Sequence, residues 1–399
     1  RITTIHKLTG KFPQQAVSEN TIRQPSRTSM PIVRCMDLQK MAGDEVEFDF
    51  VNHLGGKPIM GSRNAEGYGK AMSFAQDRLR INQARYPISA GDTMTQQRTP
   101  HQLRSLARTL GEAYMNRLQD QLSLVHMAGA RGFHNNVEWA VPLASDPDFA
   151  SILVNPVRAP SRNRHFMSTG TGLETVKAAA SEITMTTADV FNADLVDSLR
   201  AQLDSMALAP SPIEFDGDKL AADSPLRVLL VSSDQFASFA QSTNYRTYLS
   251  NAIARGQQAG NHPLFMGGDT ALWNGILMVK MPKPIRFYAG DSLRWCASYT
   301  SETETSTDLV PAAFSTTHAV DRALLLGGQA LAEAWGKHVK TGMPYFFSEK
   351  ELDHGDKLEL LLGMINGRSK IRFEIDHGDT KQFTDYGAMC IDTVVKLAA

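Results

Sequence analysis

Two short units of identical sequence hold the residues best suited to chemistry. Asp353-His354-Gly355-Asp356 recurs as Asp376-His377-Gly378-Asp379. Brought together, their carboxylates and imidazoles could hold a metal ion. Asp and Gly are also preferred residues of turns, and each unit borders an expected strand. We therefore expect two polar turns, with a metal site as the alternative.

The usual catalytic motifs are missing from the sequence. Gly69-Lys70 is followed by Ala71 in place of the Ser or Thr of a phosphate-binding loop, and Gly170-Thr171-Gly172 lacks the third glycine of a dinucleotide-binding loop. Neither a His-Glu-x-x-His nor a Gly-x-Ser-x-Gly motif occurs. We expect no catalytic, cofactor-binding or metal-binding residue and no enzyme activity. Capping or surface roles are expected for four isolated histidines, His101, His126, His134 and His318.

The cysteines are few and far apart. An odd, sparse count indicates reduced thiols and synthesis in the cytosol. We expect these residues to act as small apolar core side chains: Cys35, Cys296 and Cys390.

A basic cluster lies in the irregular region 133–183. Its members are Arg158, Arg162, Arg164 and His165. They could contact nucleic-acid phosphates, but the interleaved aromatic residues of a single-strand binder are missing. A surface loop in an assembly is an equal alternative. A Ser/Thr-rich run is expected to form an exposed acidic loop with Glu302, Glu304 and Asp308.

An extended excursion is expected over residues 50–92. Glu45–Val51 alternates charged and apolar residues, which predicts a half-exposed strand. Glycines crowd between residues 55 and 69, and further extended stretches follow around 71–74 and 79–84. This two-stranded excursion has little core of its own. Because an isolated hairpin is marginal in water, another subunit would have to supply the missing packing.

The strongest periodic signal predicts a long amphipathic helix. Thr99-Pro100 offers a cap with proline at the first helical position, and the pattern ends near Gly129 and Gly132. Some thirty residues give a helix on the order of 45 Å long. Apolar residues recur at three- and four-residue steps: Leu103, Leu106, Ala107, Leu110, Tyr114, Leu118, Leu122 and Val125.

The rest of the chain mixes helices and strands without regular βαβ alternation, so we predict an α+β fold. A helix is expected from Thr187 to about Ala209, ended by Pro210. The Ala/Leu-rich segment 319–335 is predicted as a buried helix. Further helices are expected near 234–240 and 245–255, and strands at 226–231, 276–280, 357–362, 369–375 and 389–395.

The near-zero net charge hides a division along the chain. The 399 residues include 41 Lys and Arg and 42 Asp and Glu, a composition that excludes disordered chains and strongly basic histone-like binders. No window approaches the roughly 18 apolar residues of a membrane span. Residues 1–110 carry 16 Lys and Arg against 9 Asp and Glu, and the remainder carries 25 against 33. The basic first forty residues cannot fold alone, so we expect them to contact an anionic partner or a neighbouring subunit, or to form a solvated tail.

Several stretches carry a family pattern. They are DFVNHLGGKPIMG (49–61), LRINQ (79–83), LFMG (264–267), WNGI (273–276), residues 322–335, and Gly363-x3-Gly367 followed by Lys370 and Phe373. With the order of basic arm, Gly-rich excursion, long helix and α+β body, the chain resembles the major capsid proteins of tailed phages, which have the Hong Kong 97-type fold. Within that fold it is similar to the schitovirus-type (N-four-like podovirus) major capsid family. The resemblance spans about residues 30–395 and is weakest over 133–183.

The resemblance implies a division of the chain. It comprises an N-terminal arm (1–48), an extended loop (49–95), a peripheral domain (96–185) with a spine helix (99–130), an axial domain (186–345) and closing strands (346–399). The arm would lie along neighbouring subunits. Some relatives cross-link a Lys of this loop to a neighbour's Asn. Lys57 and Lys70 match by position only, without an acidic catalytic partner, so that activity is not carried over.

The implied function is structural. Copies of the chain would assemble through hexamers and pentamers into an icosahedral head around double-stranded DNA. Implied partners are further copies, a portal, scaffold or decoration proteins, and packaged DNA by non-specific contact, but no membrane and no cofactor. The implied location is the virion, after assembly in the host cytoplasm. An encapsulin-like compartment shell and a metal-dependent α+β enzyme stay as alternatives. Intersubunit contacts are expected from Arg23, Arg27, Arg34, Lys57, Arg63, Lys70, Arg78 and Arg80.

Overall fold

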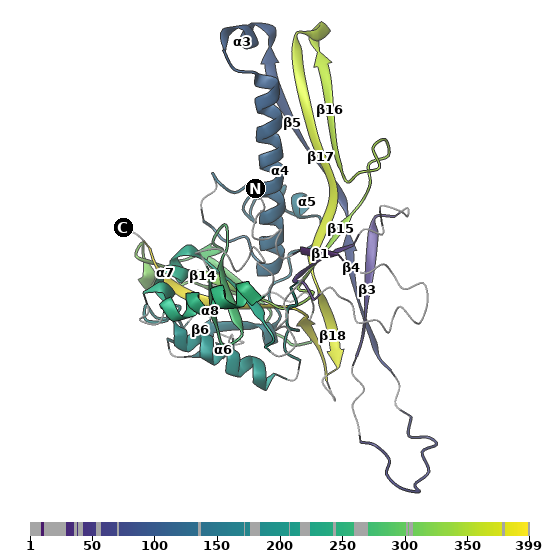
Figure 1. Ribbon diagram of the computed structural model, residues 1–399, viewed down its shortest axis with the longest axis vertical. Coiled ribbons are helices and arrows are strands. Elements are labelled where there is room, and N and C mark those ends of the chain that lie inside the picture. The colour runs from purple at the N-terminus through teal and green to yellow at the C-terminus, as the bar shows by residue number, and fades with distance from the viewer. Residues whose placement is uncertain are drawn as a thin grey trace.

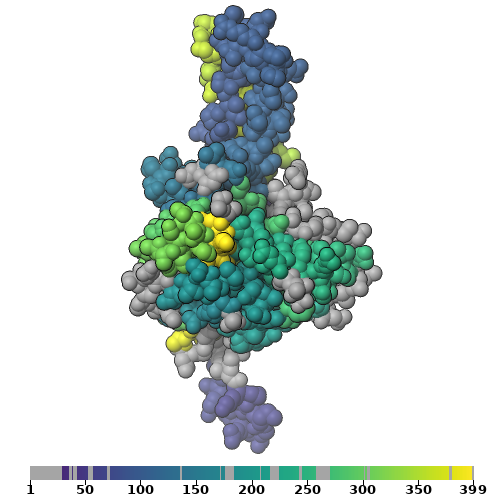
Figure 2. Space-filling model, turned by 90° about the vertical axis from the view of Figure 1, so that its left-hand side faces the viewer, coloured from purple at the N-terminus to yellow at the C-terminus, as the bar shows by residue number. Residues whose placement is uncertain are grey.

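The computed structural model has a central body with a projection at each end (Figure 1). Figure 2 shows both projections standing out from the body. Helices and strands are mixed along the chain, as the α+β prediction requires. In the part of the chain described below, no helix is long and apolar enough to cross a bilayer. The described residues are 9–11, 29–35, 38, 43–52, 57–69, 72–134, 137–170, 172–175, 184–206, 208–215, 224–241, 245–258, 270–300, 302, 306–376 and 380–397.

The body is built on an eight-stranded mixed sheet. Its strands are β6 (His165–Ser168), β7 (Leu173–Thr175), β8 (Arg227–Val231), β9 (Thr270–Trp273), β10 (Ile276–Lys280), β11 (Arg286–Phe287), β14 (His318–Leu326) and β20 (Ala388–Lys396). They lie in the order β7-β6-β20-β14-β8-β10-β9, with β11 beside β14. The helices α6 (Ala193–Ser205), α7 (Ser233–Ala240) and α8 (Tyr245–Gln258) cover one face. The other face packs on the C-terminal half of the long helix α4 (Leu103–Ala128), so alternate residues of β8 enter different cores.

A second, six-stranded sheet runs from the body along α4. Its strands are β1 (Thr9–Lys11), β2 (Ile32–Cys35), β15 (Leu331–Trp335), β16 (Tyr345–Leu352), β17 (Lys357–Lys370) and β5 (Asn82–Asp92). Helix α4 with β5, β16 and β17 forms the upper projection (Figure 1). Gly111 lets the helix approach this sheet, because a Cβ there would lie 2.1 Å from Leu362 and 2.6 Å from Ile88.

The predicted long helix is confirmed, but its start is corrected. A short helix, α3 (Thr93–Arg98), precedes it and is capped by the Asp92 side chain. Thr99 is extended and ends α3, because a residue before proline is disfavoured in helical conformation. The long helix therefore begins at Leu103 and not at Pro100, and ends at Gly129, whose φ is +67°. Its 26 residues span about 39 Å.

The lower projection is a hairpin formed by β3 (Glu45–Val51) and β4 (Phe74–Arg80). We call β3, β4 and the tip residues 57–69 the lower hairpin. Every tip residue is exposed, as expected for an excursion with little core. The expectation is wrong for the hairpin strands, because Phe48, Ala75 and Leu79 are buried in an apolar cluster with residues of β15 and β18 (Arg372–Asp376) of the same chain. The excursion is shorter than predicted, because β5 leaves the hairpin and pairs with β17 of the same chain.

The predicted helix over 319–335 is wrong. This segment forms β14 and β15, which lie in different sheets and are separated by residues 327–330, which begin with Gly327 and Gly328. Both faces of each strand are buried, so the apolar residues show no period of two that would have indicated strands.

The helix predicted from Thr187 starts later. Asn192 caps α6 by accepting a hydrogen bond from the backbone N of Leu195 at 2.8 Å, so the helix begins at Ala193. It ends at Ser205, before Pro210.

Part of the basic arm belongs to the chain's own core. Strand β2 lies between β1 and β15, in parallel with both, and Ile32 and Val33 are buried. A solvated tail is therefore excluded for residues 9–11 and 32–35, whereas residues 1–8 and 12–28 lie outside the described part.

The other predicted elements are confirmed with changes of boundary. The strands expected at 226–231, 276–280 and 389–395 and the helices near 234–240 and 245–255 are present. The strand expected at 357–362 is much longer, because β17 continues to Lys370. The stretch 369–375 divides between β17 and β18 (Arg372–Asp376). All three cysteines are buried, as expected. Smaller elements are α5 (Phe149–Leu153), β12 (Ser292–Trp295), β13 (Ser306–Leu309), β19 (Lys381–Asp385) and the 3-10 turns Arg162–Arg164, Ala312–Phe314 and Asp353–Gly355.

Candidate functional site

The first Asp-His-Gly-Asp unit forms the turn between β16 and β17. Asp353 and His354 have positive φ, and Asp353 lies 3.5 Å from the Lys357 ammonium. The predicted turn is thus confirmed for this unit. In the second unit Asp376 ends β18, and residues 377–379 are outside the described part. Within the described ranges, no three His, Cys, Asp or Glu residues are grouped to bind a metal ion.

The basic cluster 158–165 faces the interior, so its prediction as a surface loop is wrong. Arg164 is buried and donates to the backbone carbonyls of Asp385 and Leu208. Arg162 donates to the Ala297 carbonyl at 2.8 Å, and its guanidinium lies 4.7 Å from the Tyr299 ring centre. Their partners are 44 to 221 residues away in sequence, which is why local composition could not reveal them.

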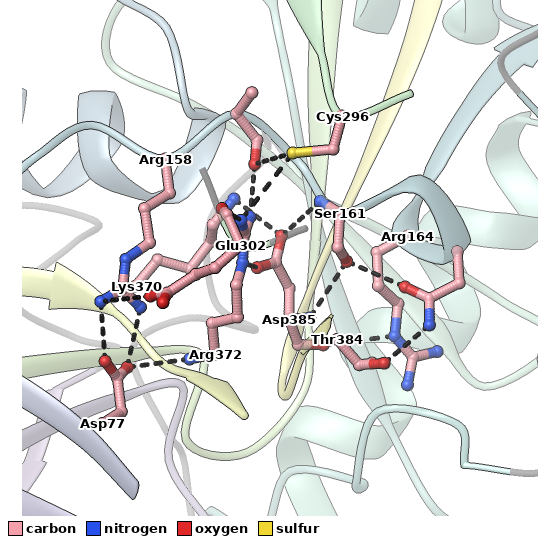
Figure 3. Close-up of polar contacts among 12 residues, drawn as sticks. Asp77, Arg158, Ser161, Arg164, Cys296, Glu302, Lys370, Arg372, Thr384 and Asp385 are labelled. Atoms are coloured by element: carbon pink, nitrogen blue, oxygen red, sulfur yellow. Dashed lines mark hydrogen bonds and ion pairs between the residues drawn. The ribbon is translucent and has the colours of Figure 1, made fainter. Parts of the chain in front are cut away.

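Asp385 is the centre of a buried network that connects β17, β18 and β19 (Figure 3). Its Oδ1 accepts a hydrogen bond from Nε of Arg372 at 2.7 Å. Its Oδ2 accepts from the backbone N of Ser161 at 3.0 Å and lies 2.7 Å from Nζ of Lys370. Burial alone would raise the pKa of Asp385, but Arg372 and Lys370 hold it well below the usual range.

Asp77 of β4 attaches the lower hairpin to the same region (Figure 3). Its two carboxylate oxygens accept hydrogen bonds from Arg158 at 2.7 and 3.1 Å. Its Oδ2 also accepts from the backbone N of Arg372 at 3.0 Å. Nη2 of Arg158, which donates to Oδ1 of Asp77, also lies 3.3 Å from Oε1 of Glu302. One guanidinium thus joins the hairpin to the body.

The expected acidic loop is only partly exposed. Glu302 pairs with Arg158, and Asp308 on β13 is buried. Glu304 lies outside the described residues. The prediction of an exposed acidic loop is wrong for Asp308.

A second buried network crosses the body sheet. Oδ2 of Asp392 lies 2.6 Å from Nε2 of His165, and Nε of Arg322 donates to Oδ1 of Asp392 at 2.8 Å. Arg322 and His165 hold the pKa of Asp392 well below its usual range although burial would raise it. Arg322 also donates to the Ala128 carbonyl at the end of α4, so the network fixes that helix to the sheet.

His126 is buried at the end of α4, which excludes the surface alternative, whereas its contact with the carbonyl of Leu153, the last residue of α5, agrees with the capping alternative. Its Nε2 lies 3.2 Å from the carbonyl oxygen of Leu153, which can only accept, so the ring carries a proton on Nε2. Burial lowers the pKa of His126 to about 4.

These networks are built to fix structure. Asp385 and Asp392 have side chains that are 1% and 0% exposed, so no substrate reaches them. Each already accepts hydrogen bonds on both carboxylate oxygens. Two hollows lie elsewhere, and neither contains a histidine or cysteine: one of about 370 Å³ between β5 and α4, and one of about 610 Å³ beside α6.

The predicted contact residues lie in three different settings. Lys57 and Arg63 are exposed on the tip of the lower hairpin. Arg78 and Arg80 are exposed on β4 and pair with Glu45 or Glu47 of β3. Arg34 instead pairs within the chain, 2.9 Å from Glu333. Arg23, Arg27 and Lys70 are outside the described residues.

The exposed apolar side chains of the lower hairpin were not predicted from the sequence as contact residues. Met60 and Tyr68 are 74% and 73% exposed on the tip. The signal was present, because large apolar residues in a Gly-rich stretch have no local core to enter. The same surface includes Val51, Ile59, Met72 and Phe74.

The comparisons with known proteins agree on one family. Residues 5–397 match the family described as phage capsid protein. No curated protein matches the sequence. The capsid of Ralstonia phage GP4 is similar with a TM-score of 0.70 and 23% identity, over 100% of this chain and 93% of that chain. The Cyanophage Pam1 capsid has a TM-score of 0.58 and 15% identity, over 96% and 94%. The capsid of Helicobacter pylori bacteriophage KHP30 has a TM-score of 0.58 and 11% identity, over 99% and 92%.

Proposed function

The chain belongs to the phage capsid protein family, and we propose that it is the major capsid subunit of a tailed phage, many copies of which form the icosahedral head around double-stranded DNA. The fold is that of phage capsid proteins, the Hong Kong 97-type fold, over nearly the full length of the solved relatives. The narrower likeness to schitovirus-type members stays a prediction.

The observation that carries the proposal is the lower hairpin. Its tip holds large apolar side chains with no core in this chain. Exposed apolar surface of this kind indicates a protein–protein contact. We infer that a neighbouring copy covers the tip, together with the exposed basic residues Lys57 and Arg63.

The proposed function requires no catalytic reaction. The buried carboxylates are saturated by arginine, lysine or histidine, and they hold distant segments together. Assembly in the host cytoplasm, a portal, scaffold or decoration proteins, and non-specific DNA contact follow from the proposed role. The division into arm, extended loop, peripheral and axial domains belongs to the proposal too.

Deletion of residues 56–68 tests the role of the tip. We expect a folded subunit with an unchanged unfolding midpoint, because the tip residues 57–69 are all exposed. We expect no stable shells, measured by size exclusion and negative-stain microscopy beside the full chain. Normal particles from the deletion would overturn the assignment of the tip to intersubunit contacts.

The content of the wild-type particles separates two kinds of shell. Double-stranded DNA in particles purified from infected cells supports the capsid role. Particles that enclose a protein cargo instead would indicate an encapsulin-like compartment, and a small soluble oligomer would contradict both.

A further inference from the structure

The two projections meet at one short stretch of backbone. Strand β4 of the lower hairpin ends at Arg80, and β5 of the upper projection begins at Asn82. Contacts to Arg80 therefore help to set the direction in which the lower hairpin leaves the body, together with the packing of its strands on β18, where the rings of Phe50 and Phe373 stack with their centres 5.1 Å apart. Two side chains from the loop after α5, Asn155 and Arg158, hold this stretch.

Asn155 clamps the backbone of Arg80. Its Oδ1 accepts from the Arg80 backbone N at 2.9 Å, and its Nδ2 donates to the Arg80 carbonyl at 2.9 Å. The same Nδ2 donates to the Arg368 carbonyl of β17 at 3.0 Å. Asn155 is 6% exposed, so water does not replace these bonds. One amide group thus connects the end of β4 to the central strand of the upper projection.

The backbone before Asn155 is in a rare conformation. Val154 has φ +64° and ψ −56°, and the Asn155 backbone N donates to the Leu153 carbonyl at 2.7 Å. This is a γ-turn of the uncommon type with positive φ, and a β-branched residue is strongly disfavoured there. Such backbone persists only where its surroundings impose it, and it is concentrated at functional positions. Here His126 contacts the same Leu153 carbonyl at 3.2 Å, and the clamp on Arg80 follows at the next residue.

Arg158 holds the hairpin three residues before Arg80. Its paired hydrogen bonds to Asp77 fix orientation as well as distance, because a guanidinium and a carboxylate meet in one plane. Asp77 is 6% exposed and points into the body. Because β4 is held at both Asp77 and Arg80, it cannot pivot about either residue alone.

We infer that Asn155 and Arg158 are positioning residues for shell assembly, which fix the angle of the lower hairpin relative to the upper projection. This inference rests on the proposed shell function. A curved shell of one size requires each subunit to present its projections at reproducible angles, so loss of the clamp affects the geometry of assembly more than the folding of the body.

The test compares Asn155→Ala with Asn192→Ala in the full chain. Asn192 also joins two backbone groups, accepting from Leu195 N and donating to the Gly170 carbonyl, but it lies at α6, away from the clamp. For Asn155→Ala we expect amide hydrogen exchange in 45–51 and 74–80 to speed up about tenfold or more in the unassembled subunit. We also expect shells of mixed diameter or open fragments by cryo-electron microscopy. For Asn192→Ala we expect a lower unfolding midpoint with uniform shells.

The outcomes separate this inference from the proposed function. Uniform shells from Asn155→Ala, or unchanged exchange in the hairpin, would overturn the positioning role. Irregular shells from both variants would show a general effect of stability and would also overturn it. A wild-type chain that forms no shells would instead contradict the proposed function. If Asn155→Ala does not fold, Arg158→Lys decides, because it keeps the charge but loses the paired geometry: uniform shells would refute the inference, and irregular shells would support it.

Discussion

The charged carboxylates of Asp385 and Asp392 are buried and have no contact with water. Removing an ion from water costs several kcal/mol, so each carboxylate depends on the cations held against it. Breaking one such pair leaves an unpaired buried charge, which typically costs about 3–5 kcal/mol. The pairs therefore determine which distant segments meet, as His165 and Asp392 do across 227 residues.

His126 makes the stability of the subunit depend on pH in acid. Burial lowers its pKa in the folded chain to about 4, against about 6.5 in the unfolded chain. Between these values the unfolded chain binds the proton and the folded chain does not. The free energy of unfolding therefore falls as the pH drops from about 6.5 to about 4, by up to about 3 kcal/mol. Above about pH 6.5 this histidine contributes no pH dependence.

We expect His126→Gln to reduce this slope, because a Gln amide can donate to the Leu153 carbonyl and does not titrate. Burial also lowers the pKa of His165, so part of the slope is retained. Urea unfolding of both proteins between pH 4 and 8 measures the effect. His101→Gln is the control, since His101 is exposed and should leave the wild-type slope intact. An unchanged slope in His126→Gln would contradict the argument.

The buried contacts of single residues could be predicted only in part. The Asp-His-Gly-Asp turn and the buried cysteines followed from residue type alone. Arg158 did not, because its burial depends on Asp77, 81 residues earlier in the chain. A basic residue is normally exposed, and only the tertiary fold supplies the carboxylate that makes burial tolerable.

Strand β17 crosses the backbone that connects β4 to β5, and Gly367 lies at the crossing. A Cβ at this position would lie 1.8 Å from the carbonyl oxygen of Arg80 and 2.8 Å from its carbonyl carbon. Backbone cannot rotate aside as the end of a side chain can. We expect Gly367→Ala to lower the free energy of unfolding by about 3 kcal/mol or more, or to prevent folding.

Gly69→Ala is the matched control for that substitution. A Cβ at Gly69 would meet no atom within 4 Å, and its φ is not positive. We expect its free energy of unfolding to stay within about 0.5 kcal/mol of the wild type. Chemical denaturation of the soluble subunits measures both, with the soluble fraction as the readout if Gly367→Ala fails to fold. Equal stability of the two variants would refute the close approach of β17.

Elements with a clear period or a clear boundary were predictable. The alternation in β3 and the apolar run of β10 gave both strands with their exact residues. The long helix was predicted, but its start depended on Thr99 ending α3. β14 and β15 were missed because strands buried on both faces have no alternation, so an Ala/Leu-rich run indicates helix equally well.

For the whole molecule, the two projections leave much apolar surface without a partner in the same chain. Leu110 on α4 is 65% exposed, and Met60 on the tip is 74% exposed. The first 110 residues carry the positive balance and the remainder the negative one. A protein with these features and a net charge of −1 suits association with copies of itself, because basic residues among the first 110 of one copy can meet the acidic remainder of another.

Hydrogen exchange in the assembled particle tests whether neighbouring copies cover the tip of the lower hairpin. We expect amides of residues 57–69 to exchange more slowly in the shell than in the free subunit, because neighbouring copies would exclude water from a tip that is fully exposed alone. Strand β20 is the internal control: it is buried in the body, so its exchange should be alike in both states. Mass spectrometry of peptides from both states measures the difference. Fast exchange at the tip in both states would mean that the tip stays solvated in the shell, and the apolar residues of the lower hairpin would then need another partner.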